Sequence, residues 1–417
     1  MTKPITAIGF KGMNNLPNAP GHFIDPDSKK IIPGIAMNVE VTDGGLLVRR
    51  GGFAKKITLA GVHSLWGGSV FLGVAAGVLY HIEGVTARAI GAVTGPPARL
   101  QYVEIDNLIY MSNPYWKGVY EVLTGTVRPW GVALPAAPSI SMTTGDLPPG
   151  AYTLCYTQAS GGRISGNGPL VQVSWEGGAQ GIRLNNLPAG GQCWITHPNG
   201  QNLFLASVTS GVVTGQVPKA IPLPSLMVSP PPGFSDFCHA FGRIWGVYGK
   251  KVYYSGSFQY EWFRPANFFP FLEELVMVAP VNEGIFVNSL GSTWFLDGTE
   301  PGKMTVRRVG DGAIPGSLTM ATMPGSVVGG GYEISRRLSA MPSPVWMSKT
   351  GFCVGTHTGH LVHLTESRLK VNPRAQGASL AQIKNGIPQI LTSLHGVKVK
   401  DDVDADLDAV FANGQIF

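Results

Sequence analysis

The sequence predicts an all-β protein, an irregular β-propeller of about five to seven blades with an immunoglobulin- or fibronectin-like β-sandwich inserted in it. Three observations carry this prediction. A strand–turn–strand unit recurs along the chain, a segment of different character bounded by proline-rich linkers interrupts the recurrence, and helical periodicity is scarce.

The recurring unit is an apolar strand, a short turn rich in Gly or Asn, and a second strand rich in aromatic residues. Its five copies lie at residues 65–82, 100–122, 237–255, 275–297 and 344–365. Turns such as Asp106-Asn107 and Phe241-Gly242 carry residue types that tolerate positive φ. Residues 244–248 are apolar on both faces, which is typical of a strand buried on both sides, as in stacked blades.

The interrupting segment begins after the linker at 134–138 and ends before a second linker at 221–232. It contains about seven short strands with turn residues between them, a pattern that suits a sandwich. The sequence is therefore divided into four regions. They are 1–135 (N-terminal strands and first blades), 136–218 (inserted sandwich), 219–370 (remaining blades) and 371–417 (ring closure or a partner contact).

The remaining segments give weaker signals. Residues 38–50 predict a strand, an Asp-Gly-Gly turn and a second strand, which could close the ring against the last blade. A further blade is expected from weak segments such as 313–331 and the N-terminal strands. Short helices are predicted near 379–384 and 404–411.

Composition narrows the function. Gly (56) and Pro (32) are abundant, as turns between many strands require, whereas charged residues (13%) are about half the usual share. The low charge favours a surface covered by partners. The net charge of +6 is modest, and its basic pairs are scattered rather than gathered in the stripe that nucleic-acid binders show. No signal peptide and no stretch of about 18 apolar residues is found, so we expect no membrane span and folding in the cytosol.

No catalytic, metal or cofactor constellation is predicted. His357, His360 and His363 are spaced by three, which puts neighbours on opposite faces of a strand. The acidic run at 401–408 resembles the start of a calcium loop but has Leu407 where Gly is needed. Isolated carboxylates that a glycosidase could use are supported by residue type alone; they are Glu104, Asp106, Glu273, Glu274 and Asp297. We expect a protein that is not an enzyme.

The four cysteines match no metal or redox spacing, so we expect free buried thiols. They are Cys155, Cys193, Cys238 and Cys353. Cys155 and Cys193 could be neighbours in the inserted domain. Aromatic side chains in loops after strands are candidates for blade packing or for subunit contact, because large aromatics dominate interfaces. The candidate interface aromatics are Tyr115, Trp116, Tyr260, Trp262, Phe263, Phe268 and Phe269.

The N-terminal motifs resemble the start of virion proteins of tailed bacteriophages. The motifs are GFKGMNN at 9–15, NVEV at 38–41, GGLLVRRGG at 44–52 and HSLW at 63–66. The divergent blades and the LPPGAYTL…GGRISGNGP insertion are similar to later parts of such proteins. The family this resembles is the tail nozzle or tubular β-propeller proteins of short-tailed phages.

The resemblance implies a structural tail protein that assembles in the host cytoplasm into a homo-oligomeric ring, typically a hexamer, below the portal and adaptor. Its implied partners are copies of itself, adaptor or portal-side proteins, tail fibres or spikes, and double-stranded DNA that passes during ejection without sequence-specific binding. A hub, stopper or fibre-attachment protein is one alternative. A glycan-binding or glycan-cleaving propeller is another, and a scaffold outside any virion is a third.

Overall fold

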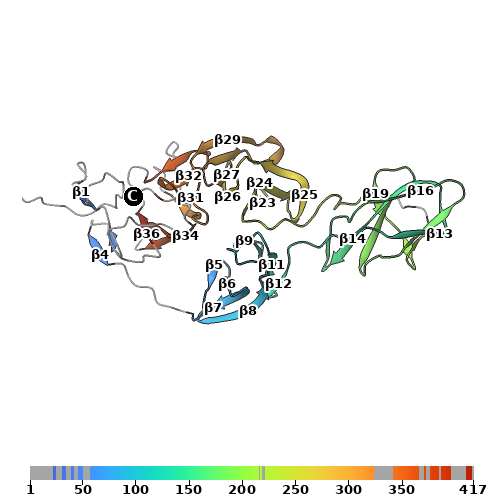
Figure 1. The fold of residues 1–417 in the computed structure, drawn as a ribbon, viewed down its shortest axis with the longest axis horizontal. Coiled ribbons are helices and arrows are strands. Elements are labelled where there is room, and N and C mark those ends of the chain that lie inside the picture. Colours follow the sequence, from blue (N-terminus) through green and yellow to red (C-terminus); the bar gives the residue numbers. More distant parts are fainter. Residues whose placement is uncertain are drawn as a thin grey trace, which may run out of the picture.

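The computed structural model describes residues 57–215, 217, 221–323, 341–365, 371, 376–384 and 387–395, together with strands at 22–24, 31–33, 39–41, 46–49 and 410–415. Strands and turns make up nearly all of these residues, and the 3-10 helix η1 (Pro301–Lys303) is the only helix among them. The sheets follow one another in an arc, and one two-layered unit projects from it on the right of Figure 1.

Five four-stranded antiparallel sheets form the blades, and each pairs its strands in sequence order. The first has β5 (His63–Gly67), β6 (Phe71–Ala75), β7 (Val78–Glu83) and β8 (Thr86–Ala92); the second has β9 (Gln101–Ile105), β10 (Leu108–Ser112), β11 (Lys117–Glu121) and β12 (Thr126–Pro129). The third has β22 (Asp236–Ala240), β23 (Arg243–Tyr248), β24 (Lys251–Gly256) and β25 (Gln259–Pro270); the fourth has β26 (Leu275–Val281), β27 (Gly284–Ser289), β28 (Thr293–Asp297) and β29 (Thr305–Gly310). The fifth has β30 (Thr319–Thr322), β31 (Pro342–Ser348), β32 (Gly351–Gly355) and β33 (Leu361–His363).

Each copy of the sequence unit lies within one of these sheets, so the protein is a β-propeller. The turns have the predicted geometry in two blades. Asp106 and Asn107 take φ of 48° and 60°, and Phe241 and Gly242 take φ of 53° and 66°. Positive φ at both central residues defines the hairpin turn whose twist matches that of the strands.

Apolar cores fill the spaces between consecutive blades. Leu72 of the first sheet and Ile109 of the second share one core, and Val119 of the second shares another with Ile244 of the third. Trp245 and Trp346 are fully buried in the cores on either side of the fourth sheet. Residues 244–247 are therefore buried on both faces, as the sequence indicated for 244–248, whereas Tyr248 at the end of the strand is exposed.

A sixth, three-stranded sheet follows the five blades. It contains β34 (Gln376–Lys384), β35 (Ile387–His395) and β36 (Val410–Gln415). Ile390 and Leu394 of β35 pack into one core with Val345 and Phe352 of the fifth sheet. The chain after residue 371 thus continues the stack of sheets.

Contacts near the inner strands tie early parts of the chain to late ones. The Arg99 guanidinium donates from Nη1 to the carbonyls of Gly316 (2.8 Å) and Gly377 (2.9 Å). A Cβ on Gly316 would lie 1.9 Å from Arg99 Nη1, and Gly316 has a φ of +78°. Only glycine permits both this approach and this backbone conformation.

Two packed antiparallel sheets form the inserted sandwich, on the right of Figure 1. One sheet has β13 (Ile140–Leu147), β17 (Gln180–Leu184), β21 (Val212–Val213) and β20 (Val208–Thr209); the other has β15 (Arg163–Ile164), β14 (Gly150–Ser160), β18 (Gly191–Thr196), β19 (Leu203–Leu205) and β16 (Val171–Trp175). Their inner faces share a core that includes Tyr152, Tyr156, Ile182 and Val213. The second and third blades pack together although the sandwich separates them in sequence.

The structure corrects two predictions. The helix expected at 379–384 is wrong, because these residues belong to β34, which pairs with β35 over nine positions. Leu380 and Ile383 have helical spacing, but the ladder and the core it covers outweigh local propensity. Residues 319–322, within the segment expected to give a further blade, instead supply the first strand of the fifth.

Two further predictions fall wholly or partly outside the described residues. The predicted helix at 404–411 overlaps β36 only at residues 410–411, and the acidic run at 401–408 lies outside the described residues. Within residues 38–50, β3 (Val39–Val41) pairs with β4 (Leu47–Arg49), and upstream β1 (His22–Ile24) pairs with β2 (Ile31–Pro33).

Candidate functional site

The joint between the propeller and the sandwich is built around an irregularity in β25. Gly256 pairs with Gln259, but the next residue back, Ser255, pairs with Phe263. Three residues, Tyr260, Glu261 and Trp262, are therefore left out of the ladder as a bulge. Bulges re-aim side chains away from a sheet, and here all three residues contact the sandwich or the blade beside it.

A half-buried ion-pair network centres on Glu261. Its two carboxylate oxygens accept from Arg128 Nη1 of β12 (2.7 Å) and from Arg163 Nη1 of β15 (2.9 Å). Arg128 also pairs through Nε with Glu121 (2.6 Å), and this hydrogen bond is the main cause that lowers the pKa of Glu121. One carboxylate thus links the second blade, the third blade and the sandwich.

Hydrogen bonds from two tryptophans flank the network. Trp262 Nε1 donates to the carbonyl of Ile164 in the sandwich (3.3 Å), and buried Trp130 Nε1 donates to the carbonyl of Tyr260 (2.9 Å). Because a buried indole N–H without a partner is costly, these bonds fix the path of the bulge.

The two linkers pack closely against a loop of the sandwich. A Cβ on Gly166 would lie 1.7 Å from the carbonyl of Val228, and one on Gly168 would lie 2.6 Å from that of Pro135. Asn167 between them accepts from the Met227 amide (2.6 Å). The sequence GNG at 166–168 is therefore required by close backbone approach, and the sandwich is attached through more than flexible linkers.

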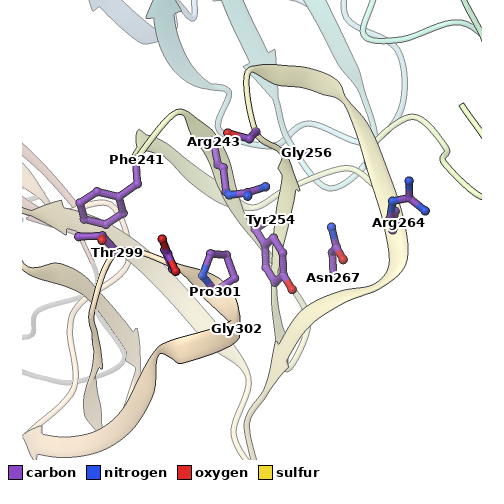
Figure 2. Close-up of a pocket in the computed structure, with 11 residues that line it drawn as sticks. Phe241, Arg243, Tyr254, Gly256, Arg264, Asn267, Thr299, Pro301 and Gly302 are labelled. Carbon is purple, nitrogen blue, oxygen red and sulfur yellow. The ribbon is translucent and has the colours of Figure 1, made fainter. Parts of the chain in front are cut away.

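A pocket of about 570 Å³ lies between the third and fourth blades. Figure 2 shows Arg243, Tyr254 and Asn267 on one side of it, with Thr299 and Pro301 on the other and Arg264 farther out on β25. Its remaining lining residues are Phe241, Gly256, Ser257, Glu300 and Gly302.

The charges of the pocket favour an anionic or hydroxyl-rich ligand. The Arg243 guanidinium donates to the Ser255 carbonyl (2.7 Å) and lies 5.9 Å from the Tyr254 ring centroid. Glu300 is the only carboxylate in the lining, and it pairs with Lys303 (2.8 Å). The usual hydrolysis of a glycoside uses a pair of enzyme carboxylates, and Glu300 alone does not make such a pair. The guanidinium and amide groups of this lining suit ligand binding.

The structure disperses the seven candidate aromatics. Tyr115 is exposed, Trp116 packs on the core between the first two blades, and Phe263 is buried. Tyr260 and Trp262 belong to the joint, while Phe269 packs with Trp245, and Phe268 lies beneath Lys251 Nζ at 4.1 Å from the ring centroid. Of the seven, Tyr115 presents the most open surface to a partner.

The other candidate side chains occupy structural positions. His357 is buried, with Nε2 3.3 Å from Ser343 Oγ and Nδ1 accepting from the Asn282 amide (3.4 Å). His363 Nδ1 lies 3.3 Å from Cys353 Sγ. Within the described part of the chain, no group of three or more His, Cys, Asp or Glu side chains is placed to hold a metal ion.

Four of the carboxylates named from the sequence also have structural roles. Glu273 accepts hydrogen bonds from the hydroxyls of Ser289 and Ser292, so it closes a turn. Asp297 pairs with Arg307 (3.6 Å), Glu104 accepts from the Ser69 amide (3.1 Å), and Asp106 occupies a hairpin turn.

All four cysteines are buried, and Cys155, Cys193 and Cys238 are free thiols. Cys155 and Cys193 lie on the neighbouring strands β14 and β18, yet they belong to cores on opposite faces of the sheet. Burial is the main cause that raises the pKa of each to about 12, so both are neutral thiols at physiological pH.

Sequence reasoning missed the charged residues that matter most, Arg99, Arg128, Arg163, Asp236 and Glu261. Glu261 lies between Tyr260 and Trp262, which the sequence indicated only as interface aromatics. The pairing partners of Glu261 lie 133 and 98 positions upstream, and no local pattern connects them.

Comparisons with known proteins bear on the fold alone. No protein-family model and no curated protein sequence matches this chain. Among solved structures it is similar to Sqt1 of Saccharomyces cerevisiae, with 9% identity, a TM-score of 0.29, and coverage of 81% of this chain and 76% of that one. It is also similar to Hsv2 of Kluyveromyces lactis, with 11% identity, a TM-score of 0.28, and coverage of 83% and 94%. It is similar as well to BBS1N, in a complex with ARL6DN, with 10% identity, a TM-score of 0.29, and coverage of 79% of this chain and 86% of that one.

The described residues contain no helix with the length and apolarity needed to cross a membrane.

Proposed function

We propose that this chain is a structural protein of a bacteriophage tail, a subunit of a homo-oligomeric ring below the portal and adaptor through which DNA leaves the capsid. The N-terminal motifs between residues 9 and 66 motivate the proposal. The structural observation that supports it is the joint at Glu261, since a part that bears load during assembly and ejection needs its projecting domain held in place.

A ring of this kind uses two different surfaces of each subunit, because head-to-tail contacts that close by rotation are heterologous. The propeller and the sandwich provide two bodies with separate faces. In the proposed arrangement one body contacts the neighbouring subunit, and the other contacts portal-side proteins, fibres or spikes. A hub, stopper or fibre-attachment protein would use the same rigid pair of bodies at another position in the tail.

The decisive experiment is cryo-electron microscopy of purified virions combined with native mass spectrometry of the recombinant chain. We expect density for the propeller and its sandwich in a ring of about six copies around the tail axis. A strictly monomeric protein that is absent from virions would refute the proposal. Density at the base of a fibre, or in a plug that closes the tail, would instead favour a fibre-attachment protein or a stopper over a nozzle subunit.

A second candidate, a glycan-binding propeller, is favoured by the pocket that contains Arg243, Arg264 and Asn267. Guanidinium groups bind carboxylates in two-pronged fashion, and an amide suits sugar hydroxyls. The test is calorimetric titration with galacturonate oligomers, with neutral galactose oligomers as the control. Binding of the acidic sugar that is lost in Arg264→Ala supports this candidate, whereas no binding of either sugar removes it.

A further inference from the structure

The outer face of the first sheet is apolar and open. Register pairs Phe71 with Ile82 and Gly73 with Tyr80 across β6 and β7, and it continues to Ala87 and Ala89 on β8. Leu65 and Val62 lie over Gly73 on the same face, because a Cβ on that glycine would meet their methyl groups at 2.9 and 3.4 Å. None of these residues is charged.

This face is exposed although its composition is that of a core. Leu65 is 66% exposed, Phe71 63% and Val62 38%. On the opposite face of the same sheet, Leu72 and Leu79 are fully buried against the second blade. An antiparallel sheet with one wet face alternates polar and apolar residues, and this sheet does not. The face of Val62, Leu65 and Phe71 is thus apolar and open in the described part of the chain.

The chain upstream of this sheet has the make-up of a blade. Four short strands, β1 to β4, pair as two antiparallel hairpins between His22 and Arg49. Eight of their twelve residues are Phe, Ile, Leu or Val. In the first hairpin the register pairs Phe23 with Ile32 and Ile24 with Ile31, so apolar residues stand at consecutive positions of both strands. Strands of this composition are expected to be buried on both sides.

Chain length permits these strands to reach the open face. Twelve residues separate Arg49 from Val62, and an extended chain of that length spans roughly 40 Å. Packed sheets are only about 10 Å apart. The strands that precede the first sheet are thus tethered close enough to cover it.

We propose that residues 22–49 form an N-terminal blade that packs on the face of Val62, Leu65, Phe71 and Gly73 and completes the propeller between the first sheet and the sheet of β34. The face thereby acts as an intramolecular docking surface for a segment of the same chain. This inference rests on packing alone and is independent of the proposed tail function.

The test is site-specific photocrosslinking of the full chain with p-benzoylphenylalanine in place of Leu65. The matched control carries the same group in place of Leu123, which is 84% exposed in the turn between β11 and β12. A mixture of ¹⁴N- and ¹⁵N-labelled protein tells links within one chain from links between chains. We expect Leu65 to crosslink to a peptide from 22–49 of its own chain and the control not to.

Each other result contradicts the proposal. A link to residues 376–395 means that the ring closes directly on the last sheet, and a link between chains means that a second copy covers the face. No link means that the face stays open. As a second measurement, Leu65→Asp should lower Tm by about 4 °C or more, against less than about 1 °C for Leu123→Asp. Equal small shifts in both variants would also overturn it.

Discussion

At the scale of single residues, Asp236 and Gly316 give the sharpest predictions about stability. Asp236 begins β22, is fully enclosed, and accepts from the Val278 amide of the next blade (2.8 Å). Burial is the main cause that raises its pKa from 3.8 to about 7, while the Val278 hydrogen bond and the charge of Arg99 oppose that shift. The folded protein therefore holds a proton there that the unfolded chain releases near pH 4.

Asp236→Asn should remove a pH dependence of stability. A raised folded-state pKa means that the free energy of unfolding falls as pH rises from about 4 to about 7 and is level above that. The variant keeps an oxygen acceptor for Val278 but has no charge to bury. We expect it to match the wild type near pH 4 and to exceed it at pH 8 by a few kcal/mol, at most about 4.

Urea unfolding at pH 5 and pH 8 measures this effect, with the exposed Asp297→Asn as the control. Two results together would contradict the raised pKa of Asp236. They are a wild-type free energy of unfolding that rises from pH 5 to pH 8, and an Asp236→Asn variant with the same pH dependence as the wild type.

Gly316→Ala should destabilise the propeller at the hydrogen bonds that Arg99 donates to Gly316 and Gly377. The added methyl would meet Arg99 Nη1 and the Gly377 carbonyl, and the residue has a φ of +78°. Gly177→Ala is a matched control, because Gly177 has a φ of +75° but nothing within 4 Å of the new Cβ. We expect both variants to cost about 1 kcal/mol for backbone strain and Gly316→Ala about 1–3 kcal/mol more. Equal losses in denaturant unfolding would show that the close approach has no energetic role.

At the scale of elements, the bulge in β25 is the part of the joint that the propeller supplies. Glu261 pairs with Arg128 and Arg163 from a position outside the ladder of β25. These contacts, and not the two linkers alone, hold the sandwich against the propeller. The sequence predicted β22 to β24 well, since apolar alternation and Asn- or Gly-containing turns are local signals, but it wrongly assigned the aromatics between 260 and 269 to loops, whereas they belong to β25. It could not predict the bulge, whose cause is contacts with residues about a hundred positions away.

Glu261→Gln should loosen the sandwich while leaving the blades folded. Both of its ion pairs are partly screened, with side-chain exposures of 16–26%, so we expect a loss of about 1–3 kcal/mol, between the values for exposed and buried pairs. Faster proteolysis within residues 221–232 and a broader distance distribution in small-angle scattering are the measurements. Glu300→Gln breaks an exposed pair on the fourth blade and should change neither.

The same limits explain the errors in element assignment. Residues 379–384 have the composition of a helix and became a strand because β35 offers a nine-residue partner and a core at Ile390. Tertiary pairing of this kind is invisible in a window of six residues. Next to the candidate aromatics Tyr260 and Trp262, the ion pairs of Glu261 are what join the two domains.

At the scale of the whole molecule, the proposed ring makes a prediction about DNA. A conduit that passes DNA rapidly should hold it weakly, since phosphate contacts raise affinity and its dependence on salt. We expect fluorescence anisotropy with a 30-base-pair duplex to show only weak binding, with no preference among sequences. Tight binding at 150 mM salt, or a strongly basic lumen in a virion reconstruction, would count against a conduit.

The bridge from Arg99 to Gly316 and Gly377 also bears on how the protein is made. Gly316 and Gly377 lie 217 and 278 positions after Arg99 in the sequence. A ribosome must therefore synthesise most of the chain before this contact can form. Until then the nascent blades expose apolar faces, the condition in which partly folded chains aggregate. Slow codons in the last hundred positions, or a chaperone that holds the chain at that stage, would therefore affect yield far more than changes in the sandwich.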